Sequence, residues 1–260
     1  MEPRVAFPQS TVEEFIDSER LMVLTARERY GRYYTHALGC AVFMSRCIEG
    51  VDHDRSMIFG RLFSQMKKHQ MLALLSAVRL HKVQAMMNLR QVLEAGAAAS
   101  FAIANPELRH FADTDKHGLL DPSQPLAKKR YAWLHQNFRD KSEWIKDTKE
   151  RINKTAAHAN VVSADSVFRV AESGDSIEAP FFDIEDEYHV KTDLLLIGSV
   201  GLTLLDLFYG VNKNWNVLGF RPDFANLMGH MSEESNILYT EMRETSRFKR
   251  AKEKFGLPNR

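Results

Sequence analysis

The sequence predicts a mainly α-helical protein, a single-domain helical bundle with one inserted β-hairpin. Two observations predict this fold class. Long stretches carry apolar residues at helical spacing together with strong helix formers, and the longest runs from Gln70 to Ala104. One segment, about residues 166–182, changes to a strand-like pattern around turn residues. We expect one domain over residues 1–260, with a core at 10–210 and a C-terminal helical extension at 223–254.

The composition is that of a soluble globular protein that can bury a core. The chain has 260 residues, of which 44% are apolar and 27% are charged. Its net charge of +1 excludes a globally basic nucleic-acid binder. The first ten residues, MEPRVAFPQS, lack the apolar core of a signal peptide, and the run Leu194–Leu205 is too short to span a membrane. We therefore expect a cytoplasmic protein without membrane contact, in which that run is a buried core helix.

The two cysteines are expected to be free. Cys40 and Cys47 are seven residues apart within a helical pattern. A helix separates them by about 10 Å along its axis, whereas a disulfide needs Cα atoms within about 7 Å of each other. Two buried thiols are the expected result, which fits a reducing compartment.

The first helix is expected to begin at a capping box. Ser10 and Thr11 are each followed three residues later by a glutamate, so either is a suitable N-cap. The helical pattern then extends from Val12 to about Glu49. Gly31 and Gly39 are candidate interruptions within it.

Two further helical stretches precede the first long loop. One is expected at about Arg55–Lys68, and the run Gln70–Ala104 follows it and stops at Asn105 and Pro106. The next segment, Pro106–Pro125, is expected to be a loop. Its Asp and His residues match no familiar metal-ligand spacing, and turns explain its Asp, Gly and Pro content, so no metal site is predicted.

The predicted hairpin lies in the second half of the chain. Val167–Phe182 is expected to form two antiparallel strands that turn at Ser173–Asp175. A lone two-stranded hairpin is only marginally stable in water. We therefore expect it to dock on the bundle through an aromatic ring, and the candidates are Phe168, Phe181 and Phe182.

The hairpin is followed by an acidic run and by the core helix. The run Asp183–Glu187 matches no calcium-loop spacing and is expected to be a solvated loop. Thr192 or Asp193 is expected to cap the core helix, which should end near Gly210.

The candidate catalytic residues lie on a helix expected from Lys141 to Asn160. Arg151 and His158 are seven residues apart, which places them within roughly 20° of each other around the helix axis and about 10 Å apart along it. The apolar stripe of this helix lies roughly 100° away, so both side chains border the buried face. The stripe consists of Ile145, Ile152, Ala156 and Ala159.

This spacing, Arg-x6-His late on a helix of a helical chain, resembles the Arg-x(4–6)-His motif of the HEPN superfamily. In addition, Arg90 and Glu94 lie in an apolar helix ahead of the Arg/His helix, which resembles an uncharacterised bacterial branch of HEPN-like proteins. The resemblance covers roughly Gln70–Tyr209. It implies a small helical bundle, often dimeric, and in many members a metal-independent RNase.

The resemblance also implies a role for each residue. His158 would act as general acid or base at the 2′-hydroxyl or the leaving oxygen of RNA. Arg151 would stabilise the charged phosphorane, and Arg90 and Glu94 would orient the pair. Neither a metal ion nor another cofactor is required.

Structural roles explain the same residues without catalysis. Asp147 precedes Arg151 by four residues, which is the spacing of an ion pair on a helix surface. A protonated His158 near the end of its helix would complement the helix dipole. Arg90 and Glu94, also four residues apart, would tie helices together as a structural ion pair.

Basic residues are enriched around the candidate site. A helix expected at about Leu126–Phe138 carries a basic cluster, and from Lys128 to His158 the chain has nine Lys or Arg residues against four Asp or Glu residues. Such a surface attracts a phosphate backbone, although a solvated pair of charged helices has the same composition. The candidate nucleic-acid contacts are Lys128, Lys129, Arg130 and Lys154.

The sequence leaves two classes of function open. In the first, the chain is a HEPN-like, metal-independent RNase, a toxin or phage-defence effector, that uses Arg151 and His158. In the second, it is a non-catalytic helical module that binds protein or nucleic acid, and that pair is structural. Small-residue and apolar helix faces, together with the two-fold site that the family resemblance implies, predict a homodimer.

Overall fold

The computed structural model describes residues 11–114, 116–121, 124–156, 161–170 and 177–255. The chain forms a mainly α-helical bundle, as the sequence predicts. The long helices are α1 (Val12–Arg46), α2 (His53–Val78), α3 (Lys82–Ala104), α4 (Gln124–Asn137), α5 (Arg139–Ala156), α7 (Glu187–Trp215) and α8 (Phe224–Glu244). Shorter segments are α6 (Val161–Ala164), α9 (Ser246–Phe255) and the 3-10 turns η1 (Leu108–His110) and η2 (Asp165–Val167).

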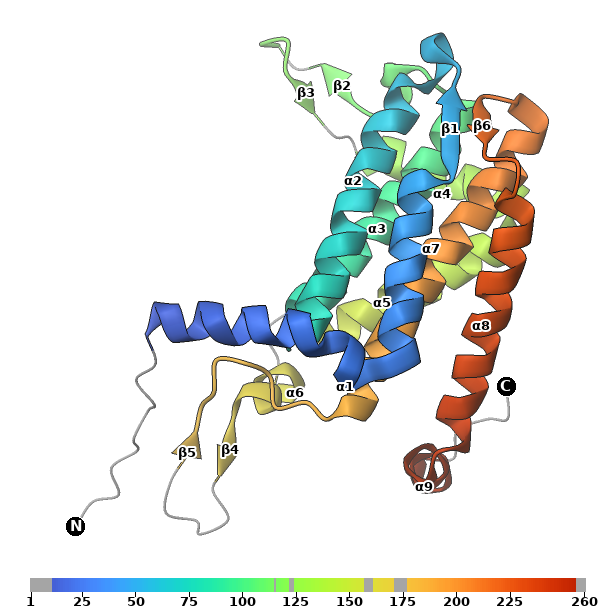
Figure 1. The fold of residues 1–260 in the computed structure, drawn as a ribbon. Helices are drawn as coiled ribbons and strands as arrows, with labels where there is room; N and C mark the ends of the chain where they lie inside the picture. The colour runs from blue at the N-terminus through green and yellow to red at the C-terminus, as the bar shows by residue number, and fades with distance from the viewer. Residues whose placement is uncertain (1–10, 115, 122–123, 157–160, 171–176, 256–260) are drawn as a thin grey trace.

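The bundle is built around α7. The second half of α1, together with α2 and α3, packs against α7, and α8 lies along the side formed by α1 and α7 (Figure 1). α4 and α5 cover α3 on the far side. The apolar stripe expected on the Arg/His helix is buried in α5, since Ile145, Ile152 and Ala156 face the core. Ala159, the fourth member of that stripe, lies outside the described residues.

α1 begins at the predicted capping box and bends at Gly31. The Thr11 side chain accepts a hydrogen bond from the backbone of Glu14, whose side chain accepts one from the backbone of Thr11. Gly31 has φ 54° and ψ −128°, a conformation that side chains other than glycine strongly disfavour. Residues 12–30, which we call the α1 arm, therefore run across the end of the bundle instead of along it (Figure 1).

The turn between α2 and α3 falls at a different place from the one expected. Neither a break near Lys68 nor an unbroken Gln70–Ala104 helix is present, because α2 continues to Val78 and α3 starts at Lys82. Leu80 occupies the left-handed position of this turn with φ 57°. Glycine or asparagine usually marks such a position, so the sequence lacked the local signal, and the packing of α2 against α3 decides the turn.

The predicted hairpin is present and docked on the bundle. β4 (Arg169–Val170) pairs antiparallel with β5 (Ile177–Glu178), while the turn expected at Ser173–Asp175 lies outside the described residues. Two of the three candidate rings make the docking contact: Phe181 and Phe182 pack on Phe15 of the α1 arm and on His81.

Two further strand pairs were not anticipated from the sequence. β2 (Asp113–Thr114) pairs with β3 (Leu120–Asp121) inside the segment expected to be a loop. β1 (Ile48–Val51) pairs antiparallel with β6 (Leu218–Phe220), which joins the end of α1 to the end of α7. The β1–β6 pairing links residues about 170 positions apart, and a contact at that separation leaves no local sequence pattern.

The core helix is longer than expected at both ends. Asp186, not Thr192 or Asp193, is the N-cap, since its side chain accepts a hydrogen bond from the backbone of His189. α7 then continues past Gly210 to Trp215. By length and composition α7 meets the requirement for crossing a membrane, but 67% of its most apolar window is buried inside the bundle. Burial of this kind is what a core helix requires, as the sequence predicts.

The cysteines are free and buried, also as predicted. Burial raises the pKa of both Cys40 and Cys47 to about 12. Both thiols are therefore protonated and unreactive at neutral pH, and their role is packing.

Candidate functional site

Glu94 on α3 is the centre of a polar cluster that joins three helices. Its Oε1 atom accepts a hydrogen bond from Arg90 Nε at 3.2 Å and lies 3.0 Å from Lys149 Nζ on α5. Lys149 also donates a hydrogen bond to the hydroxyl of Tyr131 on α4, at 2.8 Å. Burial acts to raise the pKa of Glu94, but Lys149 and then Arg90 lower that pKa overall. The cluster is thus a half-buried charged crosslink between α3, α4 and α5.

Arg151 lies on the other flank of α5. It follows Lys149 by two residues, which is about 200° around the helix axis, and its side chain is exposed. Its Nη2 atom donates a hydrogen bond to the hydroxyl of Thr148 at 3.3 Å. Within the described part of the chain, Arg151 makes no ion pair with Asp147, so the helix-surface pair considered from the sequence is not formed there.

The four candidate catalytic residues are only partly brought together. Glu94 contacts both Arg90 and Lys149, but neither Arg90 nor Glu94 contacts Arg151 among the described residues. His158 belongs to the segment 157–160, which lies outside the described residues. The described part of α5 stops two residues before it.

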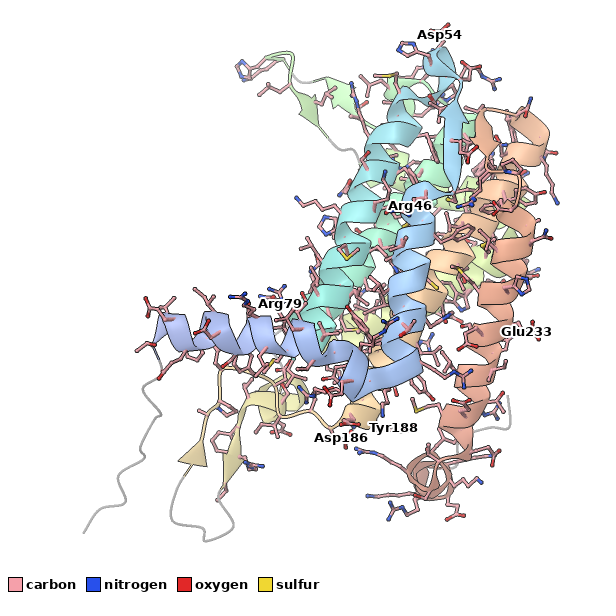
Figure 2. All side chains as sticks on the ribbon, in the orientation of Figure 1. Arg46, Asp54, Arg79, Asp186, Tyr188 and Glu233 are labelled. Atoms are coloured by element: carbon pink, nitrogen blue, oxygen red, sulfur yellow. The ribbon has the colours of Figure 1, made fainter. Side chains whose placement is uncertain are left out.

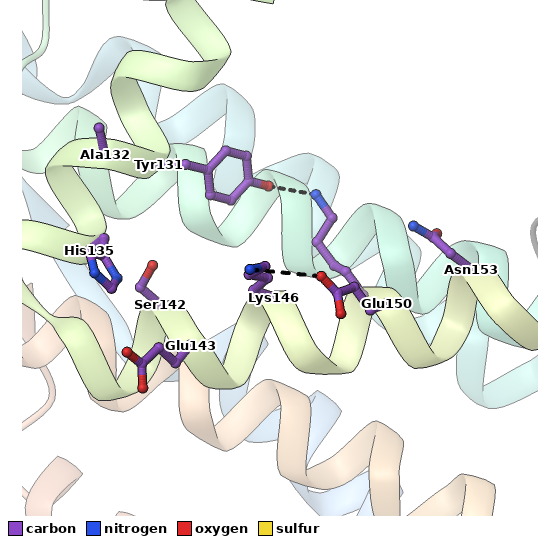
Figure 3. Close-up of a pocket in the computed structure, with 9 residues that line it drawn as sticks. Tyr131, Ala132, His135, Ser142, Glu143, Lys146, Glu150 and Asn153 are labelled. Carbon is purple, nitrogen blue, oxygen red and sulfur yellow. Dashed lines mark hydrogen bonds and ion pairs between the residues drawn. The ribbon is translucent and has the colours of Figure 1, made fainter.

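A pocket of about 590 Å³ opens between α4 and α5, beside the Glu94 cluster (Figure 3). The hydrogen-bonded pair Tyr131 and Lys149 forms part of its wall, and the exposed pair Lys146 and Glu150 lies beside its opening. The Oδ1 atom of Asn153 is buried there without a hydrogen-bond partner among the described residues. This pocket was not predicted from the sequence, although a polar stripe at helical spacing marks its α5 side: Ser142, Lys146, Lys149 and Asn153.

Three of the four candidate nucleic-acid contacts are exposed, namely Lys128, Lys129 and Lys154. Arg130 is half-buried. Its Nη1 atom donates a hydrogen bond to a backbone oxygen of η1 at 3.2 Å, and its guanidinium lies 5.4 Å from the centre of the Phe111 ring. Burial lowers the pKa of Arg130. This arginine holds α4 against the segment that follows α3.

The acidic run after the hairpin has structural partners. Asp183 accepts a hydrogen bond from the backbone nitrogen of Lys82 at 2.5 Å, and Glu185 Oε1 lies 2.5 Å from Lys82 Nζ. The run was expected to be solvated, but it ties the hairpin to the start of α3. Among the residues that the structure describes, no group of three or more His, Cys, Asp or Glu side chains is arranged to hold a metal ion.

Asp193 on α7 interacts with the charges of Lys82, Asp183 and Glu185, and the pKa of its carboxyl group is raised. Burial raises the pKa of Asp193 from 3.8 to about 7, while Lys82 acts to lower it and Glu185 and Asp183 act to raise it. Between these two values the folded chain keeps a proton on Asp193 that the unfolded chain releases. The contribution of Asp193 to the free energy of unfolding therefore falls as pH rises from about 4 to about 7.

The substitution Asp193→Asn is expected to raise the melting temperature at about pH 8 and to leave it nearly unchanged at about pH 4, because asparagine resembles the protonated acid. Calorimetric melting of both chains across this pH range measures the difference. Asp206→Asn is the control, since Asp206 forms an exposed pair with Lys141 that contributes little. If the difference in melting temperature between the Asp193 variant and the wild type does not grow with pH, the raised pKa of Asp193 is wrong.

The comparisons with known proteins return no relative. No protein-family model, no curated protein and no solved structure matches this chain.

Proposed function

We propose that this chain is a HEPN-like ribonuclease of the cytoplasm, a toxin or phage-defence effector, that cleaves RNA without a metal ion. The observation that carries the proposal is the environment of Arg151. This side chain belongs to the Arg-x6-His pattern, is exposed, and donates its hydrogen bond to a neutral hydroxyl. A guanidinium that no described carboxylate neutralises is available to bind a phosphate.

Arg151 and His158 divide the chemistry between them. The 2′-hydroxyl of RNA attacks the adjacent phosphorus and loses its proton, and the 5′-oxygen of the next nucleotide leaves and gains one. The products are a 2′,3′-cyclic phosphate and a 5′-hydroxyl end. His158 moves the proton, because imidazole titrates near neutral pH. Arg151 donates to the phosphorane oxygens, where negative charge develops.

The Glu94 cluster supports this site indirectly. Because Glu94, which Arg90 holds on α3, pairs with Lys149, it fixes α5 against α3 and so determines where Arg151 emerges from the bundle. Exposed lysines on α4 and α5 add charge that attracts the RNA backbone. These are Lys128, Lys129 and Lys154.

The proposed enzyme is a homodimer, as the family resemblance implies. Light scattering is expected to give twice the chain mass of 29.8 kDa at micromolar concentration. A mass of 29.8 kDa at every micromolar concentration would count against the dimer.

Cleavage of single-stranded RNA by the purified chain tests the function. Cleavage is expected to continue in EDTA, because the chemistry uses no metal ion. It should be lost in His158→Ala, while His53→Ala is the matched control, since His53 is exposed at the start of α2. If the purified wild-type chain cleaves no RNA, or if His158→Ala still does, the enzymatic function is wrong.

A second function is favoured by the pocket between α4 and α5. Its volume of about 590 Å³ and its wall of Tyr131, Lys149 and Asn153 suit a small polar ligand with an aromatic or apolar body. In that case the chain is a binding module without catalysis. The same RNA assay separates the two functions, since a module shows no cleavage in any variant.

A further inference from the structure

The α1 arm is held in place along one of its faces. The ring of Phe15 packs on Phe181 with ring centres 4.4 Å apart. Farther along the arm, Glu19 lies 3.1 Å from Arg79 Nη1 and 2.8 Å from His81 Nε2. Figure 2 shows Arg79 where the arm passes the end of α2. These contacts and the bend at Gly31 give the arm one orientation before any partner binds.

The opposite face of the α1 arm is apolar and uncovered. Leu24 follows Phe15 by nine residues, or two and a half helical turns, so it points away from the docked face. Leu24 is 70% exposed, Leu21 is 61% exposed and Ile16 is 59% exposed. Single exposed apolar side chains are ordinary on a monomer. Three of them on the free face of a projecting helix mark a contact surface.

Charges of opposite sign predominate in the two halves of this face. Glu13 and Asp17 lie in the first half of the arm, whereas in the second half the arginines Arg20 and Arg27 outnumber the single acid Glu28. All five side chains are exposed, and within the described chain none of them makes an ion pair. Two such arms placed side by side in opposite directions bring the acidic half of each against the basic half of the other. Their helix dipoles also oppose each other, which is favourable.

A surface with this arrangement is complementary to itself. An isologous contact requires the same patch on both copies, related by a two-fold axis. The point between Asp17 and Arg20 is the natural position for that axis, because it places the Asp17 carboxylate of each copy beside the Arg20 guanidinium of the other and Ile16 beside Leu21. The occupant that the charge order selects is therefore a second copy of this chain.

We propose that the free face of the α1 arm is a homodimer interface, in which Ile16, Leu21 and Leu24 pack on the antiparallel arm of a second copy. Asp17 lies beside Arg20 of the partner subunit. The inference names the contact surface of the proposed homodimer and does not rest on RNA cleavage.

The apolar part of the interface is tested by Leu24→Glu. Because a two-fold axis places the substitution in the interface twice, it should weaken dimerisation by at least about 100-fold. Ile237→Glu on α8 is the matched control, since Ile237 is an exposed apolar residue elsewhere on the bundle. Sedimentation equilibrium of the full chain measures the dissociation constant, and circular dichroism checks that both variants are folded.

The charge order is tested by reversal. Asp17→Arg alone should weaken the dimer, and Asp17→Arg combined with Arg20→Asp should restore it, because the exchanged charges again meet across the axis. Restoration of this kind supports self-pairing of the arms and is not expected if another protein covers them.

Three outcomes overturn the inference. If the wild type is a dimer and Leu24→Glu dimerises equally well, the two copies contact each other elsewhere. The proposed homodimer would then be correct, but this interface would be wrong. If Asp17→Arg combined with Arg20→Asp dimerises no better than Asp17→Arg alone, the antiparallel pairing of the two arms is wrong. A wild-type chain that is monomeric, for example because residues 1–10 of the same chain cover the arm, would exclude both the interface and the dimer. None of these measurements uses RNA, so they are independent of the cleavage assay.

Discussion

Replacing Arg151 by alanine is expected to lower kcat for RNA cleavage by about 10²–10³-fold and to leave the fold intact. The guanidinium meets negative charge that develops on the phosphorane, and loss of one such donor typically costs a factor of this size. The side chain is exposed and its described hydrogen bond is a single one of 3.3 Å to Thr148, so its removal costs little stability. Initial rates at saturating RNA, together with melting temperatures, measure the two effects separately.

Arg139→Ala is the matched control for this variant, because Arg139 is an exposed arginine of the same helix, paired with Glu143. Its cleavage rate should equal that of the wild type. The double variant of Arg151 and His158 should lose little more than the worse single variant, because residues that act in one step are not additive. A large fall in melting temperature without a specific loss of rate would instead assign Arg151 a structural role.

Gly96→Val is expected to destabilise the bundle by about 1–3 kcal/mol, since extra carbon atoms in a packed core have this cost. A Cβ atom at Gly96 would lie 2.5 Å from Cδ1 of Leu204 and 2.7 Å from Cδ2. Leu204 is fully buried in α7, so its side chain has no solvent-facing space to move into. The melting temperature should fall by about 2–12 °C.

Gly60→Val is the matched control, because a Cβ atom at Gly60 of α2 meets nothing within 4 Å. Its stability should lie within about 0.5 kcal/mol of the wild type or above it, since valine is a better helix former than glycine. Leu204→Ala should partly rescue Gly96→Val in the double variant, because it removes the clashing carbon atoms. Equal melting temperatures for the two glycine variants would show that α3 and α7 are not in close contact at this point.

The candidate site was predictable from the sequence only in part. The spacing of Arg151 from His158 is a property of one helix, and it could be read without a fold. The pairing of Glu94 with Lys149 could not be predicted, because Lys149 lies 55 residues away on another helix and Arg90 is a suitable partner only four residues away. In the sequence, Lys149 is one of nine basic residues between Lys128 and His158, and no pattern distinguishes it from the others. In the structure, it both lines the pocket between α4 and α5 and pairs with Glu94.

The amino-acid sequence by itself determined the features that depend on neighbouring residues. These are the capping box at Thr11, the buried helix around Leu194–Leu205 and the hairpin within residues 166–182, since capping, helical periodicity and turn chemistry act over a few positions. Tertiary structure alone decided the turn at Leu80, the direction of the α1 arm and the pairing of Glu94 with Lys149. Each of these depends on contacts between distant segments, whose energies exceed the local preferences that a single sequence displays.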